Sequence, residues 1–590
     1  MNTKTHHRGP DATGSFVEDG ISMGNNRLAI IDLSAEANQP MTDNSNRFVI
    51  VFNGEIYNFK ELKAELVDTY NFKTQSDTEV ILAVYKTWGR GGFSKLNGMY
   101  AFAIWDKQEN ELIIARDPVG VKPLFYYYDN NKCIFSSEIK GILEADVPRI
   151  FRRDMLTTYL KVLYVPEPYT PFENIWKLPP GHTLSWKAGK LEVLPFFKWN
   201  ATALPKEKNE KKALLKKTVE EAVERQLVSD RPVGVYLSGG FDSSIILSSM
   251  SKVHEKINSY SVGFDLPEKL DEEKFNADFE LARKTAEFFG STHHELKISL
   301  KDVLDNFELA IGSCDALISN PTAIPMMLLA RFVKPESTVV LSGEGGDELF
   351  GGYERYRIAR FMDVYGHVPN FLQKACSSMA LAQKLGTKAD VSLYERFMFQ
   401  KEMEVTLLLS KSFTSSKPDR QYFEKYFDHT ENPRATQMME VDFRSWLPDQ
   451  ALTLADQMSM TASVEQRVPL LDLKVVEFSR GLSQSDKVTF FDKKKLFKEA
   501  FREDLPEFLF SQPKRGWTAP GAKWLRDEHI LALVKEILSP GYYEPTAELF
   551  DWEEVNKRLL DHVEKKSYHL TSLWAIITFQ VWAKTYQATL

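Results

Sequence analysis

A glycine- and serine-rich segment in the middle of the chain has the residue types that bind phosphate. Residues 233–247 read VGVYLSGGFDSSIIL, an apolar run that is interrupted by glycine, serine and aspartate and then resumes. This pattern predicts a strand, a tight loop and a helix whose first backbone N–H groups converge on an anion. Asp242 would repel that anion unless it holds a cation such as Mg²⁺ that bridges to the phosphates. The candidate binding residues of this loop are Ser238, Gly239, Gly240, Asp242, Ser243 and Ser244.

A second loop of the same kind follows further along the chain, where residues 341–353 read LSGEGGDELFGGY. Neighbouring parallel strands end at one edge of a sheet, so we expect the two loops to lie together. One such loop alone is a plain strand-to-helix connection about as often as it is a binding site, but two loops with acidic residues in one sheet favour a binding site. Asp347 would share Mg²⁺ with Asp242, and Glu344 is an acid–base candidate. No GxxxxGK[ST] sequence occurs, which argues against γ-phosphoryl transfer with a Walker lysine.

The elements that position these loops are predicted to differ between the two parts of the chain. Residues 1–197 contain short β-like runs with glycine and asparagine turns, and helical periodicity at 60–68 and 78–88, which is typical of an α+β sandwich. The predicted strands of this part are 28–33, 47–52, 100–105, 112–116, 124–128 and 132–135.

The second part alternates strands with longer helices, which predicts an α/β domain with a parallel sheet. Its predicted strands are 233–237, 259–264 and 338–341, and helical patterns dominate beyond about residue 355. A polar, lysine-rich linker is predicted at 198–210, because an amphipathic helix follows it. We therefore expect domains at 1–197 and 211–590.

The composition is that of an ordinary cytoplasmic protein with small-molecule substrates. Charged residues make up 26% and hydrophobic residues 43%, and the net charge of −8 argues against nucleic acid or an anionic membrane as the main partner. We predict no membrane span and no signal sequence, since no apolar run is long enough. Three cysteines without metal-ligand spacing fit free thiols in a reducing compartment. The sequence leaves open whether the protein forms a homodimer.

These motifs resemble those of the glutamine-dependent asparagine synthetases. SGGFDSS is similar to the pyrophosphate loop of the ATP pyrophosphatases, and SGEGGDELFGGY to the second loop of the synthetase domain. DQMSMTASVEQRVPLLD at 456–472, KKLFKEA at 494–500 and PKRGW at 513–517 resemble further segments of that domain. In the first part, HRGPD at 7–11 and the segments around Arg27, Asn53 and Asp77 resemble the class II glutaminase domain.

For the second domain, the resemblance implies an ATP-pyrophosphatase fold and the synthesis of asparagine. ATP would adenylate the side-chain carboxylate of aspartate, and ammonia would then displace AMP. Leu237 and Val262 would line the adenine pocket, and Ser342 and Gly343 would complete the nucleotide site. Glu344 would accept a proton from ammonia, and the two loops would hold pyrophosphate and Mg²⁺.

Lys494 would stabilise the α-phosphate region, although it lies in a run of three lysines that alone would indicate a solvated face. The resemblance selects it as the catalytic one. Glu465 and Arg467 are predicted to form a structural ion pair, and Gln457 stands where the family usually has lysine or arginine.

For the first domain, the resemblance implies an αββα sandwich of the Ntn type that binds glutamine. Arg27 would bind the α-carboxylate, Asp77 would pair with the α-ammonium, and Glu55 would belong to the same glutamine site. Asn53 and the Gly54 amide would form an oxyanion hole.

The family nucleophile is a cysteine directly after the initiator methionine, and here residue 2 is Asn2. Cys133, Cys314 and Cys376 are not expected to replace it. Either a cysteine segment precedes Met1, which we favour because the glutamine-binding residues are retained, or the protein is an ammonia-dependent form. As printed, the first domain is expected to be incomplete at its N-terminus, and the chain to use ammonia.

Two rival functions stay open from the sequence. This protein could be a relative that adenylates a different carboxylate, because the sequence identifies no residue that contacts aspartate. A silent regulatory protein is disfavoured by the intact loops and Lys494.

Overall fold

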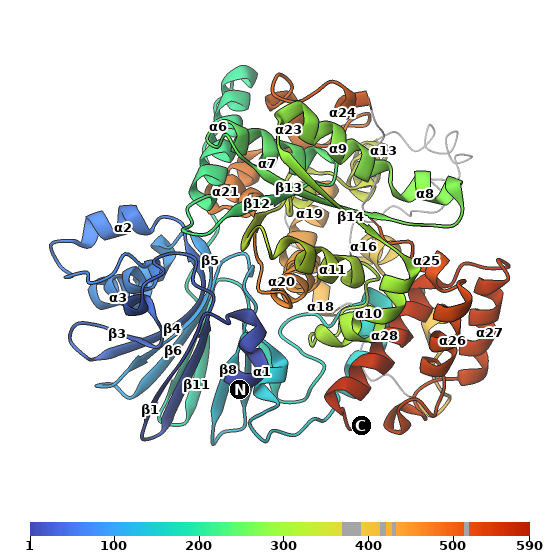
Figure 1. Cartoon of the computed structure of the whole chain (residues 1–590), viewed down its shortest axis with the longest axis horizontal. Helices are drawn as coiled ribbons and strands as arrows, with labels where there is room; N and C mark the ends of the chain where they lie inside the picture. The colour runs from blue at the N-terminus through green and yellow to red at the C-terminus, as the bar shows by residue number, and fades with distance from the viewer. Residues whose placement is uncertain (368–390, 414–420, 428–431, 512–517) are drawn as a thin grey trace.

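The computed structural model describes residues 1–367, 391–413, 421–427, 432–511 and 518–590 of the chain. The segment similar to PKxGF at 513–517 and Cys376 lie outside these residues. In Figure 1 the first domain, in blue and cyan, lies beside a larger domain built around a parallel sheet, and the C-terminal helices lie at the far end of that domain.

The first domain is built on a six-stranded antiparallel sheet with the order β11-β10-β6-β5-β4-β3. Its strands are β3 (Met41–Thr42), β4 (Phe48–Ile56), β5 (Gly98–Asp106), β6 (Glu111–Arg116), β10 (His182–Lys187) and β11 (Lys190–Pro195). Alternation along β4 sends Ile50 and Phe52 into the core beneath α2 (Phe59–Leu66) and α3 (Asp77–Trp88). Val49 and Val51 face the other side.

A second β layer covers that other face. It consists of the hairpin of β1 (Ala12–Glu18) and β2 (Ile21–Arg27), and of a three-stranded sheet with the order β8-β7-β9. The three strands are β7 (Phe125–Tyr128), β8 (Cys133–Ser136) and β9 (Ile175–Lys177). Short helices near this layer are α1 (Asn2–Thr5), α4 (Ile139–Ile142) and α5 (Leu156–Val162). The predicted α+β sandwich is confirmed.

The strand predicted at 28–33 is wrong, because β2 ends at Arg27 and no strand follows until β3. The next residues instead wrap around the Arg27 guanidinium, which donates hydrogen bonds to the carbonyls of Ile31 at 3.2 Å and Ser34 at 2.9 Å. A segment whose carbonyls converge on one side chain cannot offer them to a neighbouring strand.

The predicted linker at 198–210 also needs correction at its end. Helix α6 (Lys208–Gln226) begins within it, and the ammonium of Lys208 pairs with the carboxylate of Glu499 at 2.7 Å. The last lysine of this lysine-rich stretch, Lys208, therefore belongs to the first turn of a helix, and the irregular connection ends before it.

The second domain contains a five-stranded parallel sheet with the order β14-β13-β12-β15-β16. Its strands are β12 (Val233–Tyr236), β13 (Asn258–Phe264), β14 (Thr292–Ile298), β15 (Val339–Leu341) and β16 (Glu465–Arg467). Helices α6, α7 (Phe241–Ser251) and α9 (Ala277–Phe289) share one hydrophobic cluster. The helices α10 (Leu300–Ser313), α11 (Ala323–Val333) and α20 (Thr453–Met460) contribute to another. The predicted α/β domain is confirmed.

Helices make up most of the rest of this domain (Figure 1). They are α8 (Lys269–Phe275), α12 (Gly346–Phe350), α13 (Glu354–His367), α16 (Val391–Met398), α17 (Glu402–Thr406), α18 (Gln421–Glu424), α19 (Arg434–Arg444), α21 (Leu473–Gly481), α22 (Gln484–Lys487), α23 (Lys495–Ala500), α24 (Phe508–Ser511), α25 (Gly521–Trp524), α26 (Glu528–Ile537), α27 (Trp552–Val563) and α28 (Leu570–Tyr586). Across the described ranges, none of the helices has the length and apolar character needed to cross a bilayer.

The last residues of the chain join the two domains. Thr589 donates its backbone N–H to the carbonyl of Arg149 at 2.8 Å and accepts the N–H of Phe151 at 2.7 Å. Within α28, the indole of Trp582 donates to the carbonyl of Asp315 at 2.9 Å. The end of the chain is thus hydrogen-bonded to residues near position 150 of the first domain.

Candidate active sites

The first glycine-rich loop connects β12 to α7, as its sequence predicts. Gly239 has φ of 67°, and a Cβ there would lie 2.5 Å from the carbonyl oxygen of Asp278, so only glycine fits. The hydroxyls of Ser238 and Ser243 lie 3.0 Å apart at the start of α7, and that of Ser244 donates to the carbonyl of Gly240. Hydroxyls and a helix N-terminus therefore meet at one place, an arrangement suited to an anion.

The second loop runs from β15 to α12 and packs directly against the first. A Cβ on Gly343 would lie 2.7 Å from the Cβ of Asp242 and 2.8 Å from the backbone nitrogen of Ser243. Gly345, with φ of 87°, turns the chain into α12. The strands before these loops are hydrogen-bonded neighbours. The structure thus brings Ser342, Gly343 and Glu344 beside the first loop.

Lys494 links the two loops. Its ammonium forms ion pairs with the carboxylates of Asp242 and Asp347, the second at 2.5 Å, and its side chain is 4% exposed. The solvated-face interpretation is therefore wrong for Lys494, whereas Lys493 pairs at the surface with Glu354. Lys494 has φ of 54° at the start of α23, and its side chain points into the protein. Its burial depends on Asp242 and Asp347, which are distant in the sequence.

Asp242 and Asp347 converge on one cation, which is the arrangement that a shared divalent ion requires. The described residues contain no group of three or more histidine, cysteine, aspartate or glutamate side chains positioned to bind a metal. Mg²⁺ would therefore need oxygen ligands from a bound phosphate as well as these two carboxylates. The residues fit that use.

Two glutamates beside the Asp242, Asp347 and Lys494 cluster hold protons more tightly than usual. Burial, reinforced by Asp347 and Asp242, raises the pKa of Glu344 to about 7. Burial and Asp347 also raise the pKa of Glu348 to about 8, and its carboxylate accepts a hydrogen bond from the Tyr353 hydroxyl at 2.6 Å. Sequence reasoning missed Glu348, although it directly follows Asp347 in the same motif.

Leu237 and Val262, predicted to line an adenine pocket, are not brought together as side chains. Both are buried, but Leu237 belongs to the hydrophobic cluster of α7 and α9, and Val262 to the cluster of α10 and α11. The N–H of Leu237 donates to the carbonyl of Tyr260 at 2.8 Å. Their side chains pack in separate cores.

The first domain contains a cavity of about 660 Å³ between its β layers and the second domain. All the residues predicted to bind glutamine line it, namely Arg27, Asn53, Gly54, Glu55 and Asp77. Asn53 is on the same side of β4 as Val49 and Val51, which explains its position. The structure thus unites this predicted set.

Backbone geometry makes Gly54 irreplaceable in the cavity wall. It has φ of 139°, and a Cβ would lie 2.0 Å from the carbonyl oxygen of Met99. Asn53 beside it donates to the hydroxyl of Ser137 at 3.3 Å. Arg27 is held by its own loop, and burial lowers its pKa.

The carboxyl groups of the cavity are poorly compensated. Asp77, the first residue of α3, accepts the N–H of Ile56 at 2.8 Å, but burial raises its pKa to about 6. Burial and the nearby Asp77 raise the pKa of Glu55 well above its usual range. A ligand that brings a positive charge would therefore favour the ionised forms of both groups.

Neither Asn2 nor Cys133, which both line this cavity, is suited to nucleophilic attack. The Asn2 amide donates to the carbonyl of Gly14 at 3.2 Å. Burial raises the pKa of the Cys133 thiol to about 12, so the thiolate is scarce at neutral pH. That Cys133 reaches the cavity was not predicted. Cys314 is buried in the core of the second domain.

Comparison with known proteins agrees with this two-site architecture. An asparagine synthase family model matches residues 214–584, more than half of the chain, and a glutamine amidotransferase domain model matches residues 1–197. The chain belongs to the asparagine synthase family. The resemblance predicted from the motifs and the type of enzyme it implied are confirmed.

Relatives of this asparagine synthase family member carry more than one name. Asparagine synthetase [glutamine-hydrolyzing] 1 of Bacillus subtilis is 31% identical over 99% of this chain and 92% of its own length. A second such synthetase of B. subtilis, number 3, is 31% identical over 87% of this chain and 82% of that protein. Amidase chry2 of Gibberella zeae is 27% identical over 88% of this chain and 84% of that protein.

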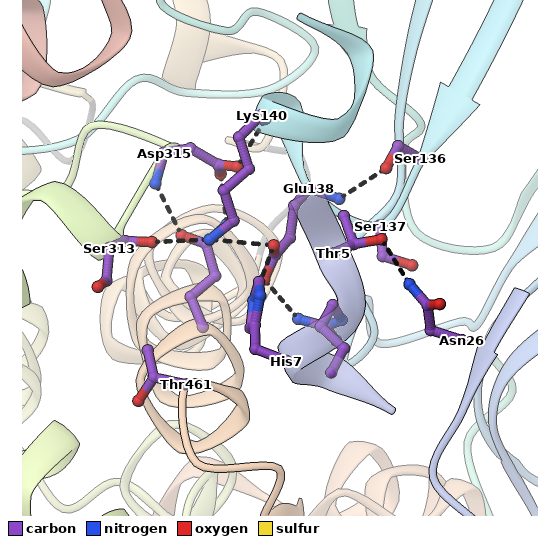
Figure 2. A network of polar contacts seen from close by, with 12 residues as sticks. Thr5, His7, Asn26, Ser136, Ser137, Glu138, Lys140, Ser313, Asp315 and Thr461 are labelled. Atoms are coloured by element: carbon purple, nitrogen blue, oxygen red, sulfur yellow. Dashed lines mark hydrogen bonds and ion pairs between the residues drawn. The ribbon is translucent and has the colours of Figure 1, made fainter. Parts of the chain in front are cut away.

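Buried charges join the two domains of this family member beside the first-domain cavity, which Arg8 lines. Figure 2 shows Glu138 at the centre, with His7 and Lys140 converging on its carboxylate. Arg8 bridges Glu138 at 3.0 Å and Asp456 of the second domain at 2.8 Å. These cations hold the pKa of Glu138 well below its usual range, although burial opposes them.

Gln457 stands where the family usually has a basic residue, and its uncharged amide takes part in this network through hydrogen bonds to Asp315. Its amide nitrogen donates to the carboxylate of Asp315 at 2.6 Å, and its amide oxygen accepts the N–H of Asp315 at 3.1 Å. Lys140 donates its backbone N–H to the same carboxylate at 3.0 Å. The predicted ion pair of Glu465 and Arg467 is confirmed at 2.9 Å.

Proposed function

We propose that this protein synthesises asparagine from aspartate, ATP and a nitrogen donor. ATP would adenylate the side-chain carboxylate of aspartate with release of pyrophosphate, and ammonia would displace AMP from the β-aspartyl adenylate. The observation that carries the proposal is the meeting of the two glycine-rich loops at Lys494, in a chain of the asparagine synthase family.

The first loop would hold the β- and γ-phosphates of ATP and retain them as pyrophosphate. Its hydroxyls at Ser238, Ser243 and Ser244 and the N-terminus of α7 supply donors at one place. Bound Mg²⁺, held by Asp242 and Asp347, would neutralise charge on the phosphates. Lys494 would then turn from these carboxylates towards the α-phosphate, where charge develops as the bond to pyrophosphate breaks.

Glu344 would serve as the base in the second step. Attack by ammonia on the adenylate carbonyl leaves an extra proton on nitrogen, and a neighbouring carboxylate can take it. A pKa of about 7 suits that task, because the group is partly ionised at neutral pH and is basic enough to accept the proton.

For the 590-residue chain we propose ammonia as the nitrogen donor, with glutamine as a ligand of the cavity in the first domain. Arg27 and Asp77 offer groups of opposite charge for an α-amino acid, and both line this cavity. Glutamine hydrolysis would need an activated nucleophile, and the raised pKa of Cys133 disfavours that thiol.

The test is pyrophosphate release by the purified chain with ATP, Mg²⁺ and ammonium across a panel of carboxylic acids. Asparagine formation that requires aspartate supports the proposal. Release with another acid and not with aspartate would favour a different amide-forming reaction, an option raised by the relative named amidase. No release with any acid would refute ligase activity.

A further inference from the structure

The three-residue strand β16 contacts the cavity of the first domain with one face and the second glycine-rich loop with the other. Glu465 and Arg467 share one side chain direction, and Gln466 takes the opposite one. Glu465 lines the 660 Å³ cavity. Gln466 donates to the hydroxyl of Ser342 at 2.8 Å. The strand therefore lies between the two candidate sites.

Arg467 is the residue of this strand that contacts both sides. Its carbonyl accepts the N–H of Ser342 at 2.9 Å, which fixes the start of the loop that carries Glu344. Its guanidinium donates to Glu465 at 2.9 Å and to the carbonyls of Gln226 and Val228, each at 2.7 Å. The side chain is fully buried, so no water competes for these contacts.

The guanidinium is shared unequally between two carboxylates. Nη2 of Arg467 lies 3.5 Å from Oε1 of Glu55, a cavity residue, whereas Nε bonds to Glu465 at 2.9 Å. Within the described part of the chain, Nη2 of Arg467 and Oε2 of Glu55 have no hydrogen-bond partner. A small displacement of the guanidinium towards Glu55 would satisfy these groups, so a second arrangement is available.

A ligand in the cavity would change the balance between these arrangements. Burial and Asp77 now favour the protonated form of Glu55, which attracts Arg467 only weakly. The α-ammonium of an amino acid near Asp77 and Glu55 would favour their ionised forms. An ionised Glu55 draws Arg467 towards the cavity and moves the carbonyl to which Ser342 is bonded.

We propose that Arg467 is a positioning residue that couples occupancy of the first-domain cavity by an α-amino acid to nucleotide binding at the second glycine-rich loop. This inference rests on the proposed function for the identity of the two ligands. By linkage, each ligand must change the affinity for the other by the same factor.

The test uses the whole chain and isothermal titration calorimetry. The Kd of L-glutamine is measured with and without saturating Mg²⁺ and α,β-methylene-ATP, and the nucleotide Kd with and without glutamine. We expect the two Kd values to change by the same factor, about fivefold or more. A factor of one, or no glutamine binding at all, overturns the proposal.

The variants separate coupling from structural support. R467K keeps the charge but loses the fork, so the factor should fall to about one while each ligand still binds alone. R225K is the matched control, because the carboxylate partner of Arg225 is Asp472, at 3.0 Å and outside β16, and this variant should keep the factor. Retention of the factor in R467K overturns the proposal.

Q466L gives an independent test if R467K does not fold. It removes the bond to Ser342 without changing the charges, and it should lower the factor at unchanged glutamine Kd. Pyrophosphate release is measured on the same preparations. Coupling without aspartate-dependent release would leave the inference standing and refute the proposed function, and release without coupling would do the reverse.

Discussion

The two candidate sites differ in how their buried carboxylates are compensated. Asp242 and Asp347 share an internal cation, Lys494, whereas Glu55 and Asp77 in the first-domain cavity have raised pKa values. The site at the two glycine-rich loops thus already contains a positive charge suited to the proposed phosphate ligand. Arg27 lines the cavity, but the pKa values of Glu55 and Asp77 stay raised there, and the α-ammonium of a ligand would supply a positive charge for these two carboxyl groups. One site is prepared for an anion, and the other offers groups of both signs to an α-amino acid.

The comparison is tested most severely at Lys494. We expect Lys494→Met to lower aspartate-dependent pyrophosphate release about 10³-fold, because it removes the cation from the point where charge develops. Glutamine binding in the cavity should be unchanged by calorimetry. Lys493→Met is the control, since that lysine pairs with Glu354 near the surface, and it should retain activity within about twofold. Comparable losses in both variants would contradict a special role for Lys494.

Glu344 tests whether the raised pKa serves catalysis. The ionised form is the base, so kcat at a fixed concentration of NH₃ should rise with pH through about 7. Glu344→Gln should lower kcat about 10²-fold and abolish this rise. If the variant keeps the same pH profile, the titrating group is a different one. Glu348→Gln tests whether the neighbouring carboxyl group is the one that titrates in the pH profile of kcat.

Gly54 tests the independence of the cavity from the nucleotide site. Gly54→Ala places a Cβ against the Met99 carbonyl at φ of 139°, and we expect the first domain to lose at least about 2 kcal/mol of stability together with glutamine binding. Gly91→Ala is the control, because nothing lies within 4 Å of its Cβ position. Thermal unfolding and calorimetry measure both effects. An unchanged glutamine Kd in Gly54→Ala would contradict the assigned site.

Asp77 tests the cavity through the pH dependence of stability alone. Its pKa is raised from about 4 to about 6 in the folded protein, so the folded state binds the proton more tightly. The resulting stabilisation is present below pH 4 and is lost as the pH rises to 6, by about 3 kcal/mol. By urea unfolding, the loss of stability between pH 4 and pH 6 should be about 3 kcal/mol smaller in Asp77→Asn than in the native chain. Asp19→Asn, on an exposed turn, should keep it.

The sequence allowed the loops to be placed because their signals are local. An apolar run followed by SGGFDSS predicts strand, loop and helix without reference to the rest of the chain, and β12 and α7 agree. Strand β16 could not be found this way, because Glu465, Gln466 and Arg467 are polar and are buried only by distant partners.

Side-chain contacts that override a local sequence signal could not be predicted either. Lys494 lies in a run of lysines that indicates solvent, and its burial depends on two aspartates far along the chain. The loop at 28–33 has the composition of a strand, but the side chain of Arg27 binds its carbonyls. A long-range ion pair decided the first case, and a local contact between a side chain and backbone carbonyls decided the second.

The hydrogen bonds between Thr589 and residues 149–151 have a consequence for how the protein is made. During translation, the first domain leaves the ribosome long before its partner residue near the end of the chain exists. The segment at 149–151 therefore cannot form these hydrogen bonds until residue 589 has left the ribosome. A fusion tag placed directly after Leu590 would enter this late-forming contact, so purification tags should be separated from it by a flexible spacer.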